Sequence, residues 1–276
     1  MNFDEYCRQK AAPPGSSSYY ALREAPYARQ ALLTALFALR RELEETVQEI
    51  HDPAVGQTKL AWWQKELAAL AAGQASHPVT RALAAHHPRL ADESDALQAL
   101  ADGYRIDLEQ ARYLDFANLR RYAAATGGTF AELVARAAAQ DPGAATPWAA
   151  PLGEALALVQ CVNEFGRYAR QGRIYVPIDD LQRFDVTAAD LMHARYSPAY
   201  RDLMAFQARR ARSALIQARD AVPVAERRTQ RTLLALAALA AALLDEVEAE
   251  RFEVLHQQIS LTPLRKLWLS WRAGRR

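Results

Sequence analysis

The chain has 276 residues, of which 51% are hydrophobic, and its 34 basic and 32 acidic side chains give a formal net charge of +2. This balance is typical of a globular protein with a sizeable core, and it excludes a mainly disordered chain and a dedicated nucleic-acid binder. Its two cysteines are too few for a disulfide framework or a zinc knuckle. The longest apolar run, residues 233–244, is too short to cross a bilayer, and the acidic amino terminus is unlike a secretory signal, so we expect a cytoplasmic protein.

Apolar residues recur at helical spacing through most of the chain. A stripe of leucines that begins near Pro26 predicts a long amphipathic helix, and a short helix is expected after His77-Pro78. The same periodicity predicts helices over residues 56–72, 94–114, 119–140 (broken near Gly127-Gly128), 148–169, 199–221 and 225–250, with a loop at 141–147. Because β-branched runs are nearly absent, we predict an all-α fold, a single domain over residues 1–276 with about ten helices around a central space.

A first cluster of charged residues lies where the leucine stripe ends. On a helix, Glu44 and Gln48 lie one turn apart on one face, as do Arg41 and Glu45. Such a cluster is typical of the solvated end of a helix. It also fits a Mg²⁺ site, because carboxylates one turn apart can offer oxygen ligands towards a cavity. The residues alone leave both interpretations open.

A second cluster lies towards the end of the apolar helix predicted over residues 148–169. Glu164 interrupts that apolar stretch, and a lone carboxylate in such surroundings is costly unless it is paired or functional. A buried ion pair with a nearby arginine and a functional carboxylate both account for it. Downstream, Arg170 and Arg173 are suited to binding phosphate, because guanidinium groups bind phosphate through two hydrogen bonds.

Several motifs, which cover nearly the whole chain, match one family in their order. They lie at residues 15–20, 36–43, 107–108, 112–113, 170–177, 206–208, 259–261 and 265–267, and the most specific is Lys59-Leu60-Ala61-Trp62-Trp63 with His77-Pro78-Val79. In these motifs the chain resembles the squalene/phytoene synthase family, in particular its bacterial presqualene diphosphate synthase branch. The resemblance implies an isoprenoid (terpenoid) synthase-type helical fold around a deep central cavity. It also implies an enzyme of isoprenoid biosynthesis that joins two prenyl diphosphates head to head.

The resemblance further assigns roles to particular residues. The side chains that it expects to hold Mg²⁺ are Glu44, Glu45, Gln48 and Glu164. Those that it expects to bind the diphosphate of the substrate are Arg41, Arg170 and Arg173, and the catalytic residues that it implies are Glu44, Glu164 and Tyr20. In such a site Mg²⁺ is shared between protein and phosphate oxygens, and its charge stabilises the departing diphosphate.

The sequence departs from the family pattern in both acidic motifs. Where the family has Asp at positions 44, 48, 164 and 168, this chain has Glu44, Gln48, Glu164 and Tyr168. Because a Mg²⁺ cluster depends on charge as well as geometry, two functions remain open. One is a divergent prenyltransferase of the farnesyl-diphosphate farnesyltransferase type that uses Mg²⁺. The other is a non-catalytic protein without a cofactor, which keeps the cavity to bind a prenyl diphosphate or another apolar lipid, or which resembles an assembly factor.

The carboxyl-terminal segment is amphipathic and basic. Leu264, Leu267, Trp268 and Trp271 share one helical face, and basic residues surround them at positions 265, 266, 272, 275 and 276. This pattern predicts either a peripheral contact with the inner face of the membrane, or a final helix that packs on the core and carries a solvated basic tail.

Overall fold

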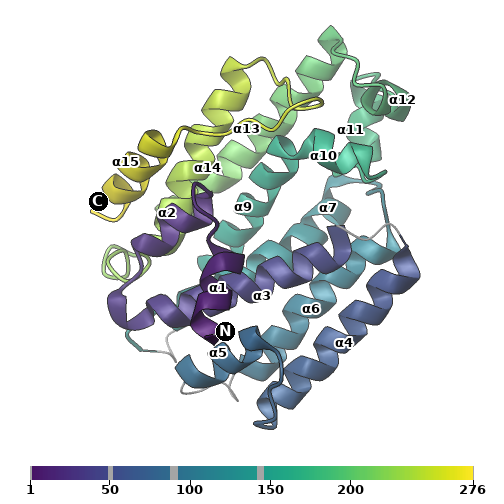
Figure 1. Cartoon of the computed structure of the whole chain (residues 1–276). Helices are drawn as coiled ribbons and strands as arrows, with labels where there is room; N and C mark the ends of the chain where they lie inside the picture. Colours follow the sequence, from purple (N-terminus) through teal and green to yellow (C-terminus); the bar gives the residue numbers. More distant parts are fainter. Residues whose placement is uncertain (1, 49–51, 88–92, 142–145, 276) are drawn as a thin grey trace.

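The structure is a computed structural model that describes residues 2–48, 52–87, 93–141 and 146–275. These residues form a bundle of helices (Figure 1), with an isolated bridge between Arg112 and Ile174 in place of any strand. In chain order the helices are α1 (Phe3–Ala11), α2 (Ser17–Arg23), η1 (Tyr27–Arg29), α3 (Gln30–Gln48), α4 (Pro53–Ala71), α5 (Pro78–His86), α6 (Ser94–Glu109), α7 (Phe116–Ala123), η3 (Ala124–Gly128), α8 (Thr129–Ala138), α9 (Ala149–Asn163), α10 (Phe165–Arg170), α11 (Ile178–Arg183), α12 (Ala188–Met192), α13 (Pro198–Asp220), α14 (Arg231–Ala249) and α15 (Pro263–Ala273). The predicted all-α fold is confirmed.

Most of the predicted helices are present, but tertiary contacts move their boundaries. The helix predicted to reach residue 114 ends at Glu109, because the chain becomes extended there and places Arg112 beside Ile174. The helix predicted over 148–169 divides at Glu164 into α9 and α10. The helices α1, α2, α11 and α12 are not expected from the sequence. The last three have seven residues or fewer, which is too short to show a periodic apolar pattern. Residues 142–145 of the predicted loop lie outside the described residues.

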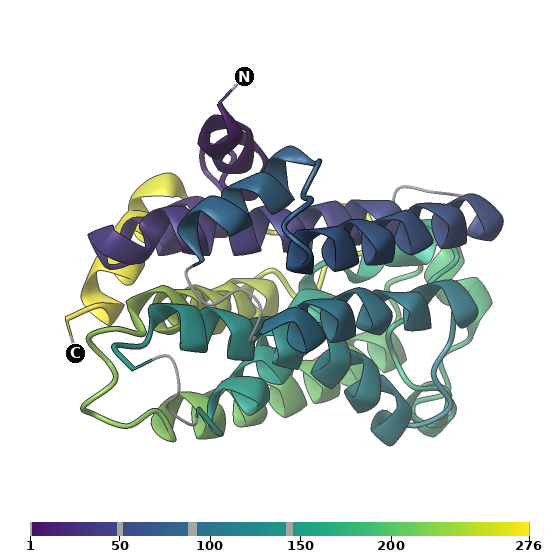
Figure 2. The same cartoon turned by 90° about the horizontal axis from the view of Figure 1, so that it is seen from below.

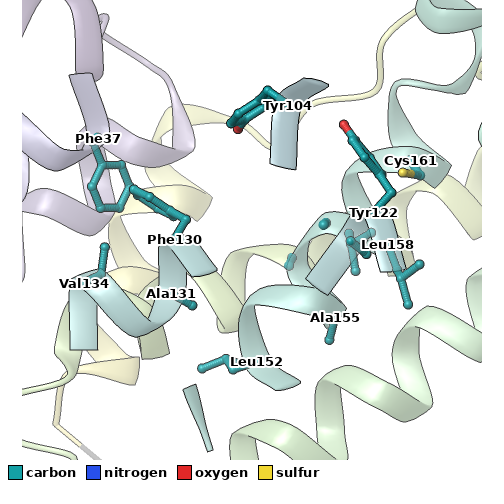
Figure 3. Packing of buried hydrophobic residues seen from close by; sticks show 14 of the residues in the cluster. Phe37, Tyr104, Tyr122, Phe130, Ala131, Val134, Leu152, Ala155, Leu158 and Cys161 are labelled. Atoms are coloured by element: carbon teal, nitrogen blue, oxygen red, sulfur yellow. The ribbon is translucent and has the colours of Figure 1, made fainter. Parts of the chain in front are cut away.

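The helices form two sides, one built around α3 and the other around α9. In Figure 2 the purple and blue amino-terminal helices lie on one side, and the teal and green helices lie on the other. Helix α9 contacts α7, α8, α10, α13 and α14, while α3 contacts α1, α4, α5 and α8. Figure 3 shows the core where these layers meet, with Phe37 of α3 against Phe130 of α8, their ring centroids 4.9 Å apart.

The predicted break near Gly127-Gly128 is a π-helical turn that brings two backbones together. This turn, η3, joins α7 to α8 and packs directly on α9. A Cβ atom placed on Gly153 of α9 would lie 2.0 Å from the carbonyl oxygen of Gly127, and one on Gly127 would lie 2.3 Å from that of Gly153. Only glycine fits at this crossing, and the contact fixes the position of α9.

The tryptophan motif performs a structural task in the middle of α4. Trp63 is buried, Trp62 is half-exposed, and both rings meet the ring of His77 edge to face. One turn further along α4, the buried Glu66 accepts hydrogen bonds from the backbone N–H groups of Ser76 and His77, at 2.7 and 2.8 Å. The hydroxyl groups of Ser76 and Thr80 donate to the same carboxylate. Glu66 therefore holds the chain that enters α5.

Gly153→Ala should destabilise the protein by about 2–3 kcal/mol, because the new methyl group overpacks a contact made by backbone atoms that cannot rotate away. The measurement is urea unfolding followed by circular dichroism. The control is Gly56→Ala in α4, where the added Cβ meets only the side-chain end of Leu108. That change should shift the stability by less than about 1 kcal/mol, and an equal loss in both variants would contradict the interpretation.

Glu66→Gln should lower the free energy of unfolding at neutral pH by about 2–3 kcal/mol, because it removes a charged acceptor from several hydrogen bonds. Burial opposes ionisation of this group, but its hydrogen bonds from His77, Ser76 and Thr80 lower the pKa of Glu66 to about 2. Because the pKa of Glu66 is lower in the folded state than in the unfolded state, its ionisation stabilises the fold. This stabilisation is complete at a pH above the unfolded-state pKa, and it is lost as the pH falls towards the folded-state pKa. In urea unfolding, the difference in free energy of unfolding between wild type and Glu66→Gln should therefore become smaller as the pH is lowered from about 5 to about 3. A difference that stays constant over this range would contradict this role.

Candidate functional site

A cavity of about 540 Å³, within the usual size range of ligand pockets, lies between the two sides of the bundle. Its walls come from the connection between α1 and α2, from α3, α9 and α14, and from the chain that enters α15. Apolar side chains cover much of the wall, among them Phe37, Leu156, Val159, Leu236, Leu239 and Leu243. The charged side chains on the wall are Lys10, Arg40, Arg41, Glu44, Glu164 and Lys266. The cavity is therefore amphipathic, with both predicted catalytic carboxylates in its wall.

The first acidic motif lies on the last turns of α3, and basic side chains neutralise its carboxylates. The Nε of Arg40 donates to Glu44 at 2.8 Å, and the buried Tyr104 hydroxyl lies 3.3 Å from the same carboxylate. The Nε of Arg41 donates to Glu45 at 2.7 Å, and Lys10 of α1 binds Glu45 as well. Glu45 is not part of the cavity wall, so this motif offers one carboxylate to the cavity.

The second acidic motif lies at the junction between α9 and α10. Arg167, one turn further along, forms an ion pair with Glu164. Burial raises the pKa of Glu164, although the charge of Arg167 opposes that shift. Glu164 thus combines the two interpretations drawn from the sequence, because it is a paired carboxylate that also lines the cavity.

Neutral side chains join the two motifs next to the cavity; Gln160 belongs to the cavity wall, whereas Tyr168 and Gln48 are buried outside it. The Nη2 of Arg40 donates to Oε1 of Gln160 at 3.0 Å, and Nε2 of Gln160 donates to the Tyr168 hydroxyl at 3.2 Å. Nε2 of Gln48 lies 3.4 Å from the same hydroxyl, and Arg167 donates to Oε1 of Gln48 at 3.0 Å. We call these residues with their two carboxylates the floor network; in order they are Glu44, Arg40, Gln160, Tyr168, Gln48, Arg167 and Glu164.

The floor network does not fit a Mg²⁺ cluster. Each carboxylate already has a guanidinium partner, which Mg²⁺ would have to displace. Burial and the charge of Glu164 raise the pKa of Tyr168 well above its usual value, so its hydroxyl stays protonated and is a poor metal ligand. Within the described part of the chain, no group of three or more His, Cys, Asp or Glu side chains is placed to hold a metal ion.

The other predicted site residues lie in different surroundings. Arg41 lines the cavity, whereas Nη1 of Arg170 donates to the carbonyl oxygen of Leu255 at 2.5 Å. Arg173 donates to the carbonyl oxygens of Asp107 and Val47, at 2.7 and 3.1 Å. Tyr20 is buried against an apolar cluster on α14 and is not part of the cavity wall. Of the three arginines expected to bind diphosphate, the structure brings Arg41 to the cavity.

The site residues expected from the sequence do not include four basic residues that bind the carboxylates or line the cavity. Arg40 lies four residues before Glu44, and Arg167 lies three residues after Glu164, so helical spacing alone could have found both pairs. Lys10 and Lys266 reach the cavity from opposite ends of the chain. No local pattern carries that signal, since only the folded bundle brings Lys10 and Lys266 to one cavity.

Asp107 is buried near the carboxyl end of α6, where it contacts side chains next to the site. It accepts hydrogen bonds from the hydroxyl groups of Tyr175 and Tyr113, at 2.7 and 3.2 Å, and lies 3.8 Å from Arg173. Burial raises its pKa to about 6, although Tyr175, Arg173 and the neighbouring tyrosines oppose the shift. Because Arg173 also binds the end of α3, this cluster ties α3, α6 and the chain after α10 together.

The chain matches known proteins along nearly its whole length. The family model for Squalene/phytoene synthase covers residues 11–265. A phytoene synthase of Arthrospira platensis is 27% identical over 276 aligned residues, which cover 95% of this chain and 89% of the relative. A 15-cis-phytoene synthase of Synechocystis sp. is 26% identical, with coverage of 96% of this chain and 82% of the relative.

Solved structures share the same fold. A dehydrosqualene synthase in complex with a ligand matches with a TM-score of 0.85 and 20% identity, over 99% of this chain and 95% of the other. Squalene synthase HpnC from Alicyclobacillus acidocaldarius matches with a TM-score of 0.73 and 20% identity, over 91% of this chain and 94% of the other. The isoprenoid synthase-type fold expected from the sequence is therefore confirmed.

Asp107→Asn should make the stability of the protein less dependent on pH. A folded-state pKa raised to about 6 gives stability that is present at low pH and is lost as the pH rises through that value. When the pH is raised from 5 to 8, the free energy of unfolding measured in urea should fall by about 1–2 kcal/mol more for wild type than for Asp107→Asn. Asp95→Asn, at an exposed position of the same helix, should keep the wild-type slope; equal slopes in all three proteins would contradict the assignment.

Proposed function

The chain belongs to the squalene/phytoene synthase family, and we propose that it binds a prenyl diphosphate, or a lipid with a similar anionic head, without ionising it. Ionisation of a prenyl diphosphate in this family requires positive charge on the departing group, supplied by Mg²⁺ at two acidic motifs. In this chain both motifs are closed into the floor network. The single observation that carries the proposal is that Arg40 and Arg167 occupy the carboxylates to which the metal would bind.

The cavity wall suits an amphiphilic ligand. Lys266 is buried, and its Nζ donates to the carbonyl oxygen of Gly15 at 2.8 Å and to the hydroxyl of Ser260 at 3.1 Å. Both partners are neutral, and burial lowers the pKa of Lys266. An anionic head beside Lys266 would supply the negative charge that these neutral partners lack. Arg41, which is paired with Glu45, lies in the same cavity wall. The leucines of α14 and the apolar residues of α9 would cover the hydrocarbon tail.

A divergent head-to-head prenyltransferase is the second candidate. Two facts favour it: Glu44 and Glu164 both remain in the cavity wall, and relatives of similar length are phytoene synthases. Activity of this type would require Mg²⁺ to displace both arginines from their carboxylates. The floor network opposes that exchange, so we place this function second.

The cellular setting that we propose is the cytoplasm, with contact at the inner face of the membrane. Among the described residues, no helix is long and apolar enough to cross a bilayer. A net charge of +2 and the absence of a basic stripe in the sequence argue against nucleic acid as a partner. An amphiphilic ligand of the kind that we propose would reach the cavity from a lipid surface.

Isothermal titration calorimetry with farnesyl diphosphate tests the proposal. The affinity should be the same in EDTA and in Mg²⁺, and no diphosphate should be released. Lys266→Met should weaken binding by roughly tenfold to a hundredfold, because it removes a charged hydrogen-bond donor from the head group. The affinity for farnesol, which has no diphosphate, should stay at the wild-type value.

Lys59→Met, at an exposed position of α4, is the matched control and should bind farnesyl diphosphate like wild type. Mg²⁺-dependent release of diphosphate that Glu164→Ala abolishes would overturn the proposal in favour of the prenyltransferase. Failure of wild type to bind either farnesyl diphosphate or farnesol would overturn both functions.

A further inference from the structure

Helix α15 presents its apolar side chains to solvent. Leu264, Leu267, Trp268 and Trp271 share one face and are 79, 43, 50 and 48% exposed. The opposite face holds Lys266 and Ser270, which are 7 and 1% exposed. A helix at the surface of a globular protein normally buries its apolar face and exposes its polar one. In α15 this order is largely reversed.

The reversal has a cause in the bundle. Lys266 must point inward, because its ammonium group binds the carbonyl oxygen of Gly15 and the hydroxyl of Ser260 at the cavity. Arg265 forms an ion pair with Glu246 of α14, on the side of the helix that faces α14. With these two neighbours in place, the leucines and tryptophans three and four residues away lie on the outside.

The charged side chains of α15 itself all have one sign. Residues 262–275 contain no acidic side chain and carry basic ones at positions 265, 266, 272 and 275; Arg276 lies outside the described residues. The guanidinium of Arg272 lies 4.8 Å from the ring centre of Trp268, and that of Arg275 lies 4.3 Å from that of Trp271. Each of the two exposed tryptophans of α15 thus has an arginine directly beside its ring.

We propose that the outer face of α15 docks on an anionic lipid bilayer. We call this face the docking face; it consists of Leu264, Leu267, Trp268 and Trp271 with Arg272 and Arg275. Tryptophan is enriched at membrane interfaces, where its ring suits the boundary between head groups and acyl chains. Arginines beside the rings bind anionic head groups, and binding strengthens with both apolar area and charge.

Charge complementarity favours a bilayer over a second copy of the chain. Two copies joined through their docking faces would bring Arg272 and Arg275 of each against the same basic residues of the other. An anionic bilayer instead supplies negative charge all round the helix and a hydrocarbon layer for its leucines. The docking face is also one helix wide, which suits insertion into the head-group region.

The position of α15 connects this surface to the cavity. Helix α15 lies along α14 and contacts α2, at the edge of the bundle where the chain ends (Figure 1). Ser260, Leu261 and Lys266, just before and within α15, belong to the cavity wall. A bilayer in contact with the docking face therefore lies beside the wall through which a lipid would enter. This route rests on the proposed function, whereas docking itself does not.

Cosedimentation with vesicles tests the docking. Wild type should bind vesicles of phosphatidylcholine mixed with phosphatidylglycerol in equal amounts, and it should bind vesicles of phosphatidylcholine alone more weakly. The double variant Trp268→Ala/Trp271→Ala should bind the mixed vesicles at least about tenfold more weakly, since it removes most of the apolar area that would enter the interface. Arg272→Gln/Arg275→Gln should remove the preference for anionic vesicles.

Trp62→Ala is the matched control, because Trp62 is 46% exposed on a different helix, α4. It should bind the mixed vesicles like wild type, and circular dichroism would show that each variant is folded. Equal vesicle binding by wild type and the tryptophan double variant would overturn the proposal. A wild-type dimer in analytical ultracentrifugation that the double variant loses, without vesicle binding, would assign the face to a second copy instead.

A titration without vesicles separates this proposal from the proposed function. The Trp268→Ala/Trp271→Ala variant should bind farnesyl diphosphate in buffer as wild type does, because neither tryptophan belongs to the cavity wall. Loss of vesicle binding with unchanged ligand binding supports docking by α15. If wild type binds vesicles but binds no prenyl ligand, docking through α15 is supported and the proposed ligand is overturned.

Discussion

Two carboxylates in the wall of an amphipathic cavity impose the main electrostatic constraint on this protein. Glu44 and Glu164 come from α3 and from the junction of α9 and α10, and an uncompensated charge there would cost several kcal/mol. Arg40 and Arg167 supply the compensation, and Gln160, Tyr168 and Gln48 connect the two pairs through hydrogen bonds. Ion pairs and hydrogen bonds within the chain thus compensate both carboxylates.

The floor network needs its helices at fixed separations. Backbone contact between Gly127 and Gly153 sets the distance from η3 to α9, and no side chain intervenes that could adjust it. From the other side, Arg173 binds the ends of α3 and α6 through Val47 and Asp107. The family motif around Arg173 therefore holds the scaffold together in this chain.

The buried Lys266 connects the cavity to the surface of the protein. Lys266 is held inward by neutral oxygen atoms at the cavity, and its orientation turns the leucines and tryptophans of α15 outward. One buried cation thereby links the polar part of the cavity wall to the apolar face of the helix outside it. A ligand with an anionic head and a hydrocarbon tail would find matching chemistry in both places.

The sequence by itself determined the helical class, the long helices, the break at Gly127-Gly128 and the residues of both acidic motifs, because each leaves a local pattern in spacing or in family motifs. It also contained the pairs of Arg40 with Glu44 and Arg167 with Glu164, at helical spacing. Only the tertiary structure decided that Gln48 and Gln160 meet at Tyr168, that Arg170 and Arg173 bind backbone carbonyls, and that Lys10 and Lys266 share one cavity. These contacts join residues far apart in the chain, and their geometry depends on how the helices pack.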